Sequence, residues 1–188
     1  MNVLAVTGYK PHEMNISSVN DQRIRYIKET IKRRLLHLIN EGIQWVLVSG
    51  QMGVEIWTCE VVIELKRVYA IKLAIVPPFD GQETRWPESI QQLYQNILME
   101  ADFVQLLYES TYKGAYQFKA KNKFMVDKSD ACLLMIDEEF PGSNRFFLEE
   151  AMHKHKHVAY PIYYMTPLDL EDTMQAMIEE EQINTVND

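Results

Sequence analysis

Residues 45–55 read Trp-Val-Leu-Val-Ser-Gly-Gln-Met-Gly-Val-Glu, and this stretch decides the fold. The first four residues form an apolar run of strand length, and two glycines follow within five residues. From Val54 to about Tyr69 the apolar residues recur at helical spacing. A strand, a glycine loop and a helix in this order are typical of proteins that alternate parallel strands with helical crossovers.

The same alternation continues in both directions along the chain. Strands are expected at residues 3–6, 45–48, 73–76, 103–107, 131–136 and 158–162. Helices are expected at residues 21–41, 54–69, 87–100, 120–126 and 145–155, and from Thr166 onward. The pattern predicts a single α/β domain over residues 1–188, with a doubly wound, mostly parallel sheet flanked by helices. The acidic residues 179–188 are expected to fray.

Composition narrows the class of function. The 188 residues carry a formal charge of −8, which argues against a broad basic face for duplex DNA but leaves a local basic groove open. We do not expect a nucleic acid as the main partner. No apolar run approaches the roughly 20 residues of a membrane span, and the first residues lack a basic leader. We therefore expect a cytoplasmic protein without a signal peptide or a membrane span.

Cysteine and histidine usage predicts no metal site. Cys59 and Cys132 lie in apolar stretches and are expected to be core residues. His153 and His157 could share a helical face, but no cysteine or carboxylate lies beside them in an obvious ligand pattern. Cations near a helix C-terminus are the simpler interpretation of these histidines.

Ligands of doubly wound sheets bind at the carboxyl ends of the strands, near the point where the strand order reverses. The first such end contains Thr7, Gly8 and Lys10, where glycine allows close backbone approach and lysine supplies a cation. An ordinary strand-end turn would also contain Gly and Pro. The sequence of this loop alone therefore does not distinguish a structural role from a ligand-binding role.

The second strand end contains Ser49, Gly50, Gln51 and Gly53, directly before a helix. Backbone N–H groups at a helix N-terminus can bind phosphate. Glu55 in the first helical turn could accept hydrogen bonds from ribose hydroxyls, or it could only favour the helix dipole.

The third strand end contains Gly142, Ser143 and Asn144. Small residues before a helix again suit a phosphate. The alternative is a turn followed by an asparagine N-cap.

Five segments together resemble one family. They are TGYKP at 7–11, SGQMGVEIW at 49–57, PPFDGQETRWPE at 77–88, KNKFMVDKSD at 121–130 and PGSNRFFLEEA at 141–151. They are similar to the YpsA family of Gram-positive bacteria, which belongs to the Rossmann-like SLOG superfamily with DprA and the LOG-type phosphoribohydrolases. The resemblance covers nearly the whole chain.

The resemblance implies a nucleotide-type ligand, such as an ADP-ribose or NAD-like cofactor, and a link to cell division and envelope stress. It assigns ligand contacts to the Gly50–Gly53 loop, Glu55 and Asn122. Trp57, Arg85 and Trp86 lie in family segments, and either tryptophan could border the base or ribose. Lys121 stands where the DprA-like relatives commonly have arginine.

One departure concerns catalysis. The phosphoribohydrolases carry P-G-G-x-G-T-x-x-E, whereas residues 141–149 read Pro-Gly-Ser-Asn-Arg-Phe-Phe-Leu-Glu. Glu55 and Glu149 are the only candidates for a catalytic carboxylate, and the altered motif argues against inherited hydrolysis.

We therefore interpret the chain as a regulatory protein that binds a nucleotide-type ligand and acts on a partner of the division machinery, with homodimerisation as a weaker expectation. Phosphates would bind at Gly8, Gly50, Gly53 and Gly142. The alternatives are a nucleoside-monophosphate phosphoribohydrolase and a DprA-like single-stranded nucleic-acid binder. Residues Tyr108, Tyr112, Tyr116, Phe118, Lys113, Lys119, Lys121 and Lys123 would serve the latter role, or would only cover the cleft.

Overall fold

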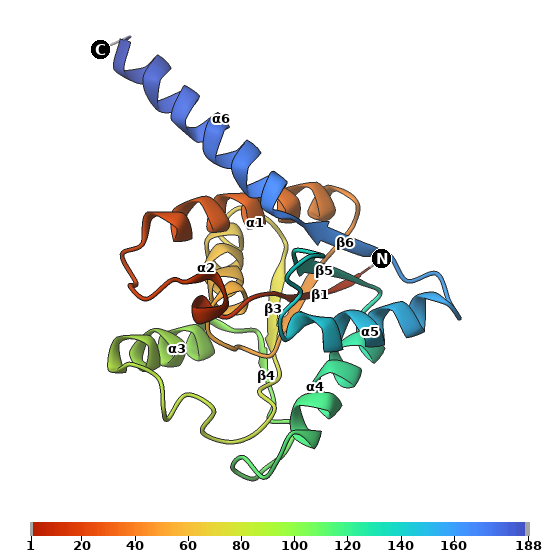
Figure 1. The fold of residues 1–188 in the computed structure, drawn as a ribbon. Helices are drawn as coiled ribbons and strands as arrows, with labels where there is room; N and C mark the ends of the chain where they lie inside the picture. Colours follow the sequence, from red (N-terminus) through yellow and green to blue (C-terminus); the bar gives the residue numbers. More distant parts are fainter. Residues whose placement is uncertain (1, 187–188) are drawn as a thin grey trace.

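The structure is a computed structural model, and it describes residues 2–186. Its sheet has six strands in the order β4-β3-β2-β1-β5-β6, and every neighbouring pair is parallel. The strands are β1 Val3–Thr7, β2 Trp45–Val48, β3 Lys72–Ile75, β4 Phe103–Val104, β5 Ala131–Met135 and β6 Ile162–Met165. The predicted α/β, Rossmann-like, doubly wound sheet is confirmed (Figure 1).

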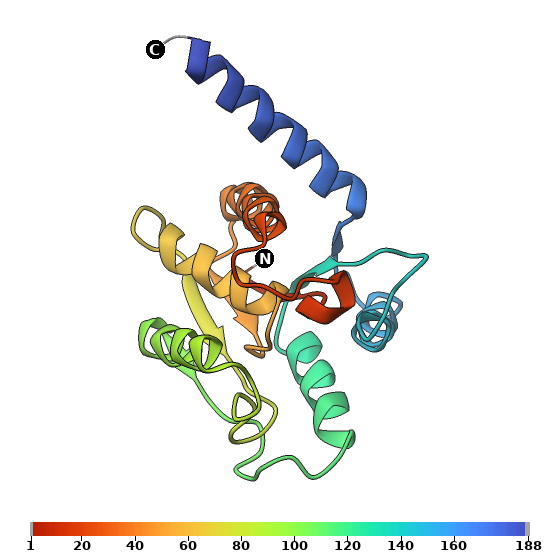
Figure 2. The same cartoon turned by 60° about the vertical axis from the view of Figure 1, so that its left-hand side comes forward.

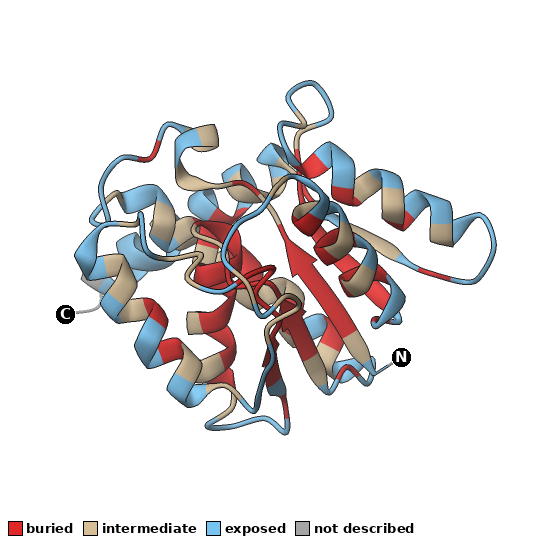
Figure 3. Cartoon of the chain, turned by 90° about the horizontal axis from the view of Figure 1, so that it is seen from below, coloured by how far each residue is buried: buried red, intermediate tan, exposed pale blue. Residues whose placement is uncertain are grey.

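Helices cover both faces of this sheet. The helices are the 3-10 helix η1 Pro11–Met14, α1 Gln22–Asn40, α2 Val54–Leu65, α3 Glu88–Glu100, α4 Tyr116–Asp127, α5 Asn144–His155 and α6 Pro167–Val186. Buried residues of α1, α2 and α3 pack on one face, together with Leu4 and Val6. Buried residues of α4 and α5 pack on the other, together with Ala5. Because side chains alternate along a strand, neighbouring residues of β1 belong to separate cores. Figure 3 shows strands of the sheet coloured as buried, with helices packed over them.

The strand order places a crevice beside β1. The chain runs outward from β1 through β2, β3 and β4, and then returns to the other side of β1 with β5 and β6. The crossovers on the two sides lie on opposite faces of the sheet. The helices therefore diverge at the carboxyl ends of β1 and β5, which is where ligands of such folds bind.

Several predicted boundaries are wrong. Helix α2 ends at Leu65 rather than Tyr69, and Val68 is 79% exposed. Strand β6 covers Ile162–Met165 rather than 158–162, because the register pairs Cys132 with Ile162 and leaves Val158 exposed. Strand β4 has only two residues, and α4 begins at Tyr116, four residues earlier than expected.

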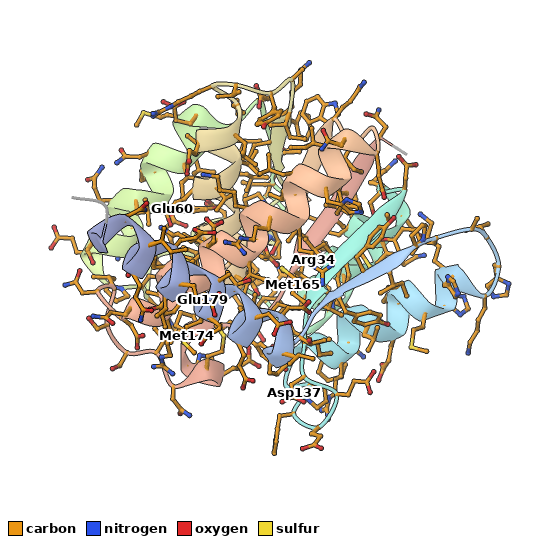
Figure 4. The ribbon with its side chains drawn as sticks, turned by 90° about the horizontal axis from the view of Figure 1, so that it is seen from above. Arg34, Glu60, Asp137, Met165, Met174 and Glu179 are labelled. Atoms are coloured by element: carbon orange, nitrogen blue, oxygen red, sulfur yellow. The ribbon has the colours of Figure 1, made fainter. Side chains whose placement is uncertain are left out.

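The C-terminal segment is helical where it is described. Helix α6 continues to Val186, lies across α1 and extends beyond the rest of the chain (Figures 2 and 4). Ion pairs from Arg33 to Glu180 and from Arg25 to Glu181 hold it there. The fraying expected of residues 179–188 stays a prediction, and residues 187 and 188 lie outside the described residues.

Two further expectations concern composition. Cys59 and Cys132 are buried, as expected of core residues. No helix among residues 2–186 is long and apolar enough to cross a membrane.

Candidate functional site

A cavity of about 240 Å³ lies at the switch point between β1 and β5. Its walls come from the ends of β1 and β2, from α4 and from the start of α5. Seven predicted ligand residues line it: Thr7, Gly8, Lys10, Gln51, Asn122, Ser143 and Asn144. The others lining it are Ala115, Phe118, Lys119, Lys121, Phe146 and Phe147. We call it the lysine cavity, after Lys10, Lys119 and Lys121.

Lys121 is the most unusual residue of this cavity. It is 6% exposed, and within the described part of the chain no hydrogen bond or ion pair engages its ammonium group. Burial lowers its pKa; the charge of Glu55 opposes this shift, and the charge of Lys10 adds to it. Because the Lys121 side chain is almost entirely buried and has no close anion, an anionic ligand in the cavity would offset the cost of this burial and the repulsion from Lys10.

The adjacent residue Asn122 has a second unsatisfied group. Its side-chain Oδ1 atom is buried and has no hydrogen-bond partner among residues 2–186. Buried polar atoms of native proteins are nearly always hydrogen-bonded, so a buried oxygen without a donor needs an explanation. A ligand hydroxyl or N–H group in the lysine cavity would donate to this oxygen.

The surroundings of the two residues favour negative charge. The N-cap residues of α4 and α5, Ala115 and Ser143, both line the cavity. The N-termini of two helices, with their partial positive charge, therefore lie at the cavity. No aspartate or glutamate is among the lining residues that the structure describes. The cavity is thus locally positive in a chain whose formal charge is −8.

Aromatic side chains form the apolar part of the wall. Phe118 packs edge-on against Phe79 with 5.6 Å between ring centroids, and Tyr112 packs on both rings. The Lys10 ammonium lies 5.9 Å from the centre of the Phe118 ring. Phe146 stands on the opposite, α5 side of the cavity and is 44% exposed. A planar ring could therefore contact Phe118 or Phe146.

Glu55 is not placed as the sequence predicts. It is 2% exposed and accepts hydrogen bonds from the Thr7 Oγ1 atom at 2.7 Å and from the Ser49 backbone N–H and hydroxyl, each at 2.7 Å. The Gln51 N–H adds a contact at 3.3 Å. These donors use both carboxylate oxygens, so Glu55 joins the ends of β1 and β2 and does not face the lysine cavity.

The glycines also have protein neighbours where phosphates were expected. Gly53 has a φ of +93°, and a Cβ atom there would lie 2.3 Å from the Tyr9 carbonyl oxygen. That oxygen accepts the Val54 N–H, so the start of α2 is bonded within the protein. A Cβ atom on Gly50, whose φ is +77°, would lie 3.0 Å from the Tyr94 ring and from Ile75. The phosphate role expected of Gly50 and Gly53 therefore has no support in the geometry.

The loop at residues 142–144 is hydrogen-bonded to Glu13, a residue that the sequence did not predict for the site. Its Oε1 atom accepts the Ser143 N–H and hydroxyl, each at 2.9 Å, and its Oε2 atom accepts the Lys10 N–H at 2.8 Å. Burial alone would raise the pKa of Glu13, but these hydrogen bonds and the charge of Lys10 lower it overall. A Cβ atom on Gly142 would lie 2.6 Å from the same Oε1 atom. An internal carboxylate thus lies where a ligand phosphate was predicted.

Four predicted residues lie away from the lysine cavity. Trp57 lines a second, largely apolar cavity of about 470 Å³ between the starts of α1 and α3. Trp86 packs edge-on against Tyr94 with 5.2 Å between ring centroids. Arg85 and Glu149 are exposed on the surface.

The histidine pair does not complete a metal site. The rings of His153 and His157 are 4.9 Å apart. Among the described residues, no group of three histidine, cysteine, aspartate or glutamate side chains could hold a metal ion.

Comparison with known proteins agrees with the motifs. The YpsA family model, described as the YspA SLOG family, matches residues 4–170. UPF0398 protein OB1025 of Oceanobacillus iheyensis is 45% identical over 175 residues, which cover 93% of this chain and 94% of that protein. UPF0398 protein YpsA of Bacillus subtilis is 42% identical over 176 residues, which cover 93% and 98% respectively.

A solved structure has the same fold. DNA processing protein A from Helicobacter pylori matches with a TM-score of 0.55 and 13% identity, over 96% of this chain and 81% of that one. That protein is described by its single-stranded DNA binding mode. At this identity the likeness shows the fold alone.

Proposed function

The chain belongs to the YpsA SLOG family, and from this premise we propose that it binds a phosphorylated, nucleotide-type ligand in the lysine cavity. One observation carries the proposal: Lys121 is buried, is positively charged below its lowered pKa, and has no close anion among residues 2–186. A protein retains such an unfavourable group most readily where it is used for binding.

The lining residues suggest how the parts of the ligand are arranged. A phosphate group binds the Lys121 and Lys10 ammonium groups, and its charge removes the repulsion between them. A sugar hydroxyl or base N–H donates to the orphan Asn122 Oδ1 atom. The cavity of about 240 Å³ is smaller than the roughly 300–1,000 Å³ of pockets for drug-sized ligands. The base then lies at the mouth, against Phe118 or Phe146.

Binding rather than cleavage is the proposed activity. Hydrolysis of an N-glycosidic bond uses carboxyl groups beside the bond, and no carboxylate lines the described cavity. Glu55 is held by Thr7 and Ser49, and Glu149 is exposed. In the proposal, ligand binding changes a surface that a protein of the division machinery recognises. This part rests on the family resemblance alone.

Calorimetric titration at physiological salt tests the proposal. AMP and ADP-ribose are titrated separately into the wild type, into Lys121→Met and into the matched control Lys123→Met. Lys123 lies on the same helix, but it is exposed and pairs with Asp127. We expect saturable binding of at least one of the two ligands, which is lost in Lys121→Met and kept in Lys123→Met. No binding of either ligand to the wild type, or equal binding to all three proteins, would contradict the proposal.

A second candidate is a single-stranded nucleic acid. Tyr112 and Tyr116, at 55% and 51% exposure, lie beside the lysine cavity with the exposed Lys113 and Lys119. Exposed aromatic rings interleaved with lysines can stack bases and bind the backbone. This candidate predicts salt-sensitive binding of an oligothymidylate that weakens in Tyr112→Ala. Absence of oligothymidylate binding at low salt would exclude this second candidate.

A further inference from the structure

Glu13 has a position that an external anion would otherwise occupy. Its carboxylate lies at the N-terminus of α5, where the Ser143 N–H and hydroxyl both donate to one oxygen. A helix N-terminus and a hydroxyl are ordinary ligands of phosphate. Ser143 also lines the lysine cavity, so this N-terminus and the unpaired Lys121 belong to the same site.

Both oxygens of the Glu13 carboxylate accept hydrogen bonds from the protein. Its second oxygen accepts the N–H of Lys10, the N-cap residue of the same 3-10 helix η1, and Lys10 also lines the cavity. Gly142 has a φ of +54°, and a side chain there would collide with the carboxylate. The backbone of the loop is thus shaped around Glu13, and hydrogen bonds from both sides lower the pKa of its carboxyl group overall.

From this geometry we infer that Glu13 is a specificity residue: it acts as an internal anion at the α5 N-terminus, and the cavity therefore takes a ligand with one phosphate rather than two adjacent phosphates. The inference rests on the proposed function and narrows its ligand class. The phosphate binds at Lys121 and Lys10, while a second phosphate reaching Ser143 would meet the Glu13 carboxylate. Nucleoside monophosphates and sugar monophosphates fit this arrangement, and a diphosphate bridge is disfavoured by like-charge repulsion.

The test compares inorganic phosphate with pyrophosphate by calorimetric titration into three variants. Glu13→Ala removes the internal anion and frees the Ser143 donors. Glu13→Gln keeps an oxygen acceptor without the charge, and it serves if the alanine variant does not fold. Glu139→Ala is the matched control, because Glu139 is an exposed acid of the same β5–α5 connection and its carboxylate has no hydrogen bond or ion pair within residues 2–186.

We expect the wild type and Glu139→Ala to bind phosphate at least as tightly as pyrophosphate. In Glu13→Ala, the affinity for pyrophosphate should rise about tenfold or more, as expected when a charge-assisted hydrogen bond is gained, while phosphate changes little. Glu13→Gln should show a smaller rise in the same direction. Unchanged pyrophosphate affinity in a folded Glu13 variant, or an equal gain in Glu139→Ala, would overturn the inference. If the wild type binds neither anion, the proposed function itself fails.

Discussion

Replacing Lys121 by methionine should stabilise the fold and abolish ligand binding at the same time. Methionine is similar in length and flexible, so it can follow the path of the lysine side chain between Gln117 and Met125 on the inner side of α4. The substitution removes the ammonium group of a residue that is 6% exposed as a whole, and this group has no close anion in the described part of the chain. Even a buried ion pair can often be replaced by well-packed apolar residues with no loss of stability or with a gain of about 1–4 kcal/mol, and a buried charge without a close partner is less favourable still.

The expected size of both effects follows from this burial. We expect the free energy of unfolding at pH 7 to rise by about 1–3 kcal/mol, and a chain of this length should gain roughly 2–4 °C in Tm per kcal/mol. Loss of a charge-assisted contact should weaken phosphate or AMP binding by about 10- to 100-fold. Gain of stability with loss of binding is typical of a residue kept for function.

Thermal and urea unfolding, followed by circular dichroism, measure the first effect, and calorimetric titration measures the second. Lys123→Met, on the same helix but exposed, should change neither quantity beyond about 0.5 kcal/mol. A lower Tm in Lys121→Met would show that the ammonium group stabilises the fold, for example through the charge of Glu55. That result would refute the reasoning, as would unchanged ligand affinity.

Three further predictions concern the same region. Phosphate affinity should fall as the pH rises through the pKa of Lys121, which burial lowers from its ordinary value of 10.5, because binding requires the ammonium form. Titrations at several pH values measure this, and constant affinity up to pH 10.5 would contradict it. Glu55→Gln should lower the free energy of unfolding by about 2–4 kcal/mol, because the amide presents N–H groups to the Ser49 donors. Urea unfolding measures this change, and a loss under about 1 kcal/mol would count against the hydrogen-bond network. Gly53→Ala should destabilise the fold by more than 1 kcal/mol even without ligand, since its Cβ atom would meet the Tyr9 carbonyl, and a wild-type Tm would disprove this.

Much of the fold could be predicted from sequence because the central strands β1, β2, β3 and β5 are short and mostly buried. Residues 45–48 and 131–135 are continuous apolar runs, which parallel strands covered on both faces require. Boundaries set by tertiary contacts could not be predicted this way. Strand β6 is placed by its register with β5, and the end of α6 is held by ion pairs to α1.

The site was only partly predictable for a similar reason. The strand-end rule points to Thr7, Gly8, Lys10 and Gln51, and these four residues line the lysine cavity; their contact with a ligand stays a prediction. It could not show that Glu55 uses both oxygens within the protein, because that depends on distances between two strand ends.

Lys121 did leave a signal in the sequence that was not used. Gln117, Lys121 and Met125 recur at intervals of four residues and are all buried on one stripe of α4. A lysine at such a position is rare unless it has a partner or a function. Glu13 left no comparable signal, since its partner Ser143 is 130 residues away.

A crystal structure of the protein grown with AMP tests the central claim most directly. The account predicts density for the phosphate within hydrogen-bond distance of the Lys121 ammonium, with the Asn122 Oδ1 atom accepting from a ligand donor and Glu13 still bonded to Ser143. Density for AMP in the Trp57 cavity or at the start of α2, with the lysine cavity empty, would contradict it.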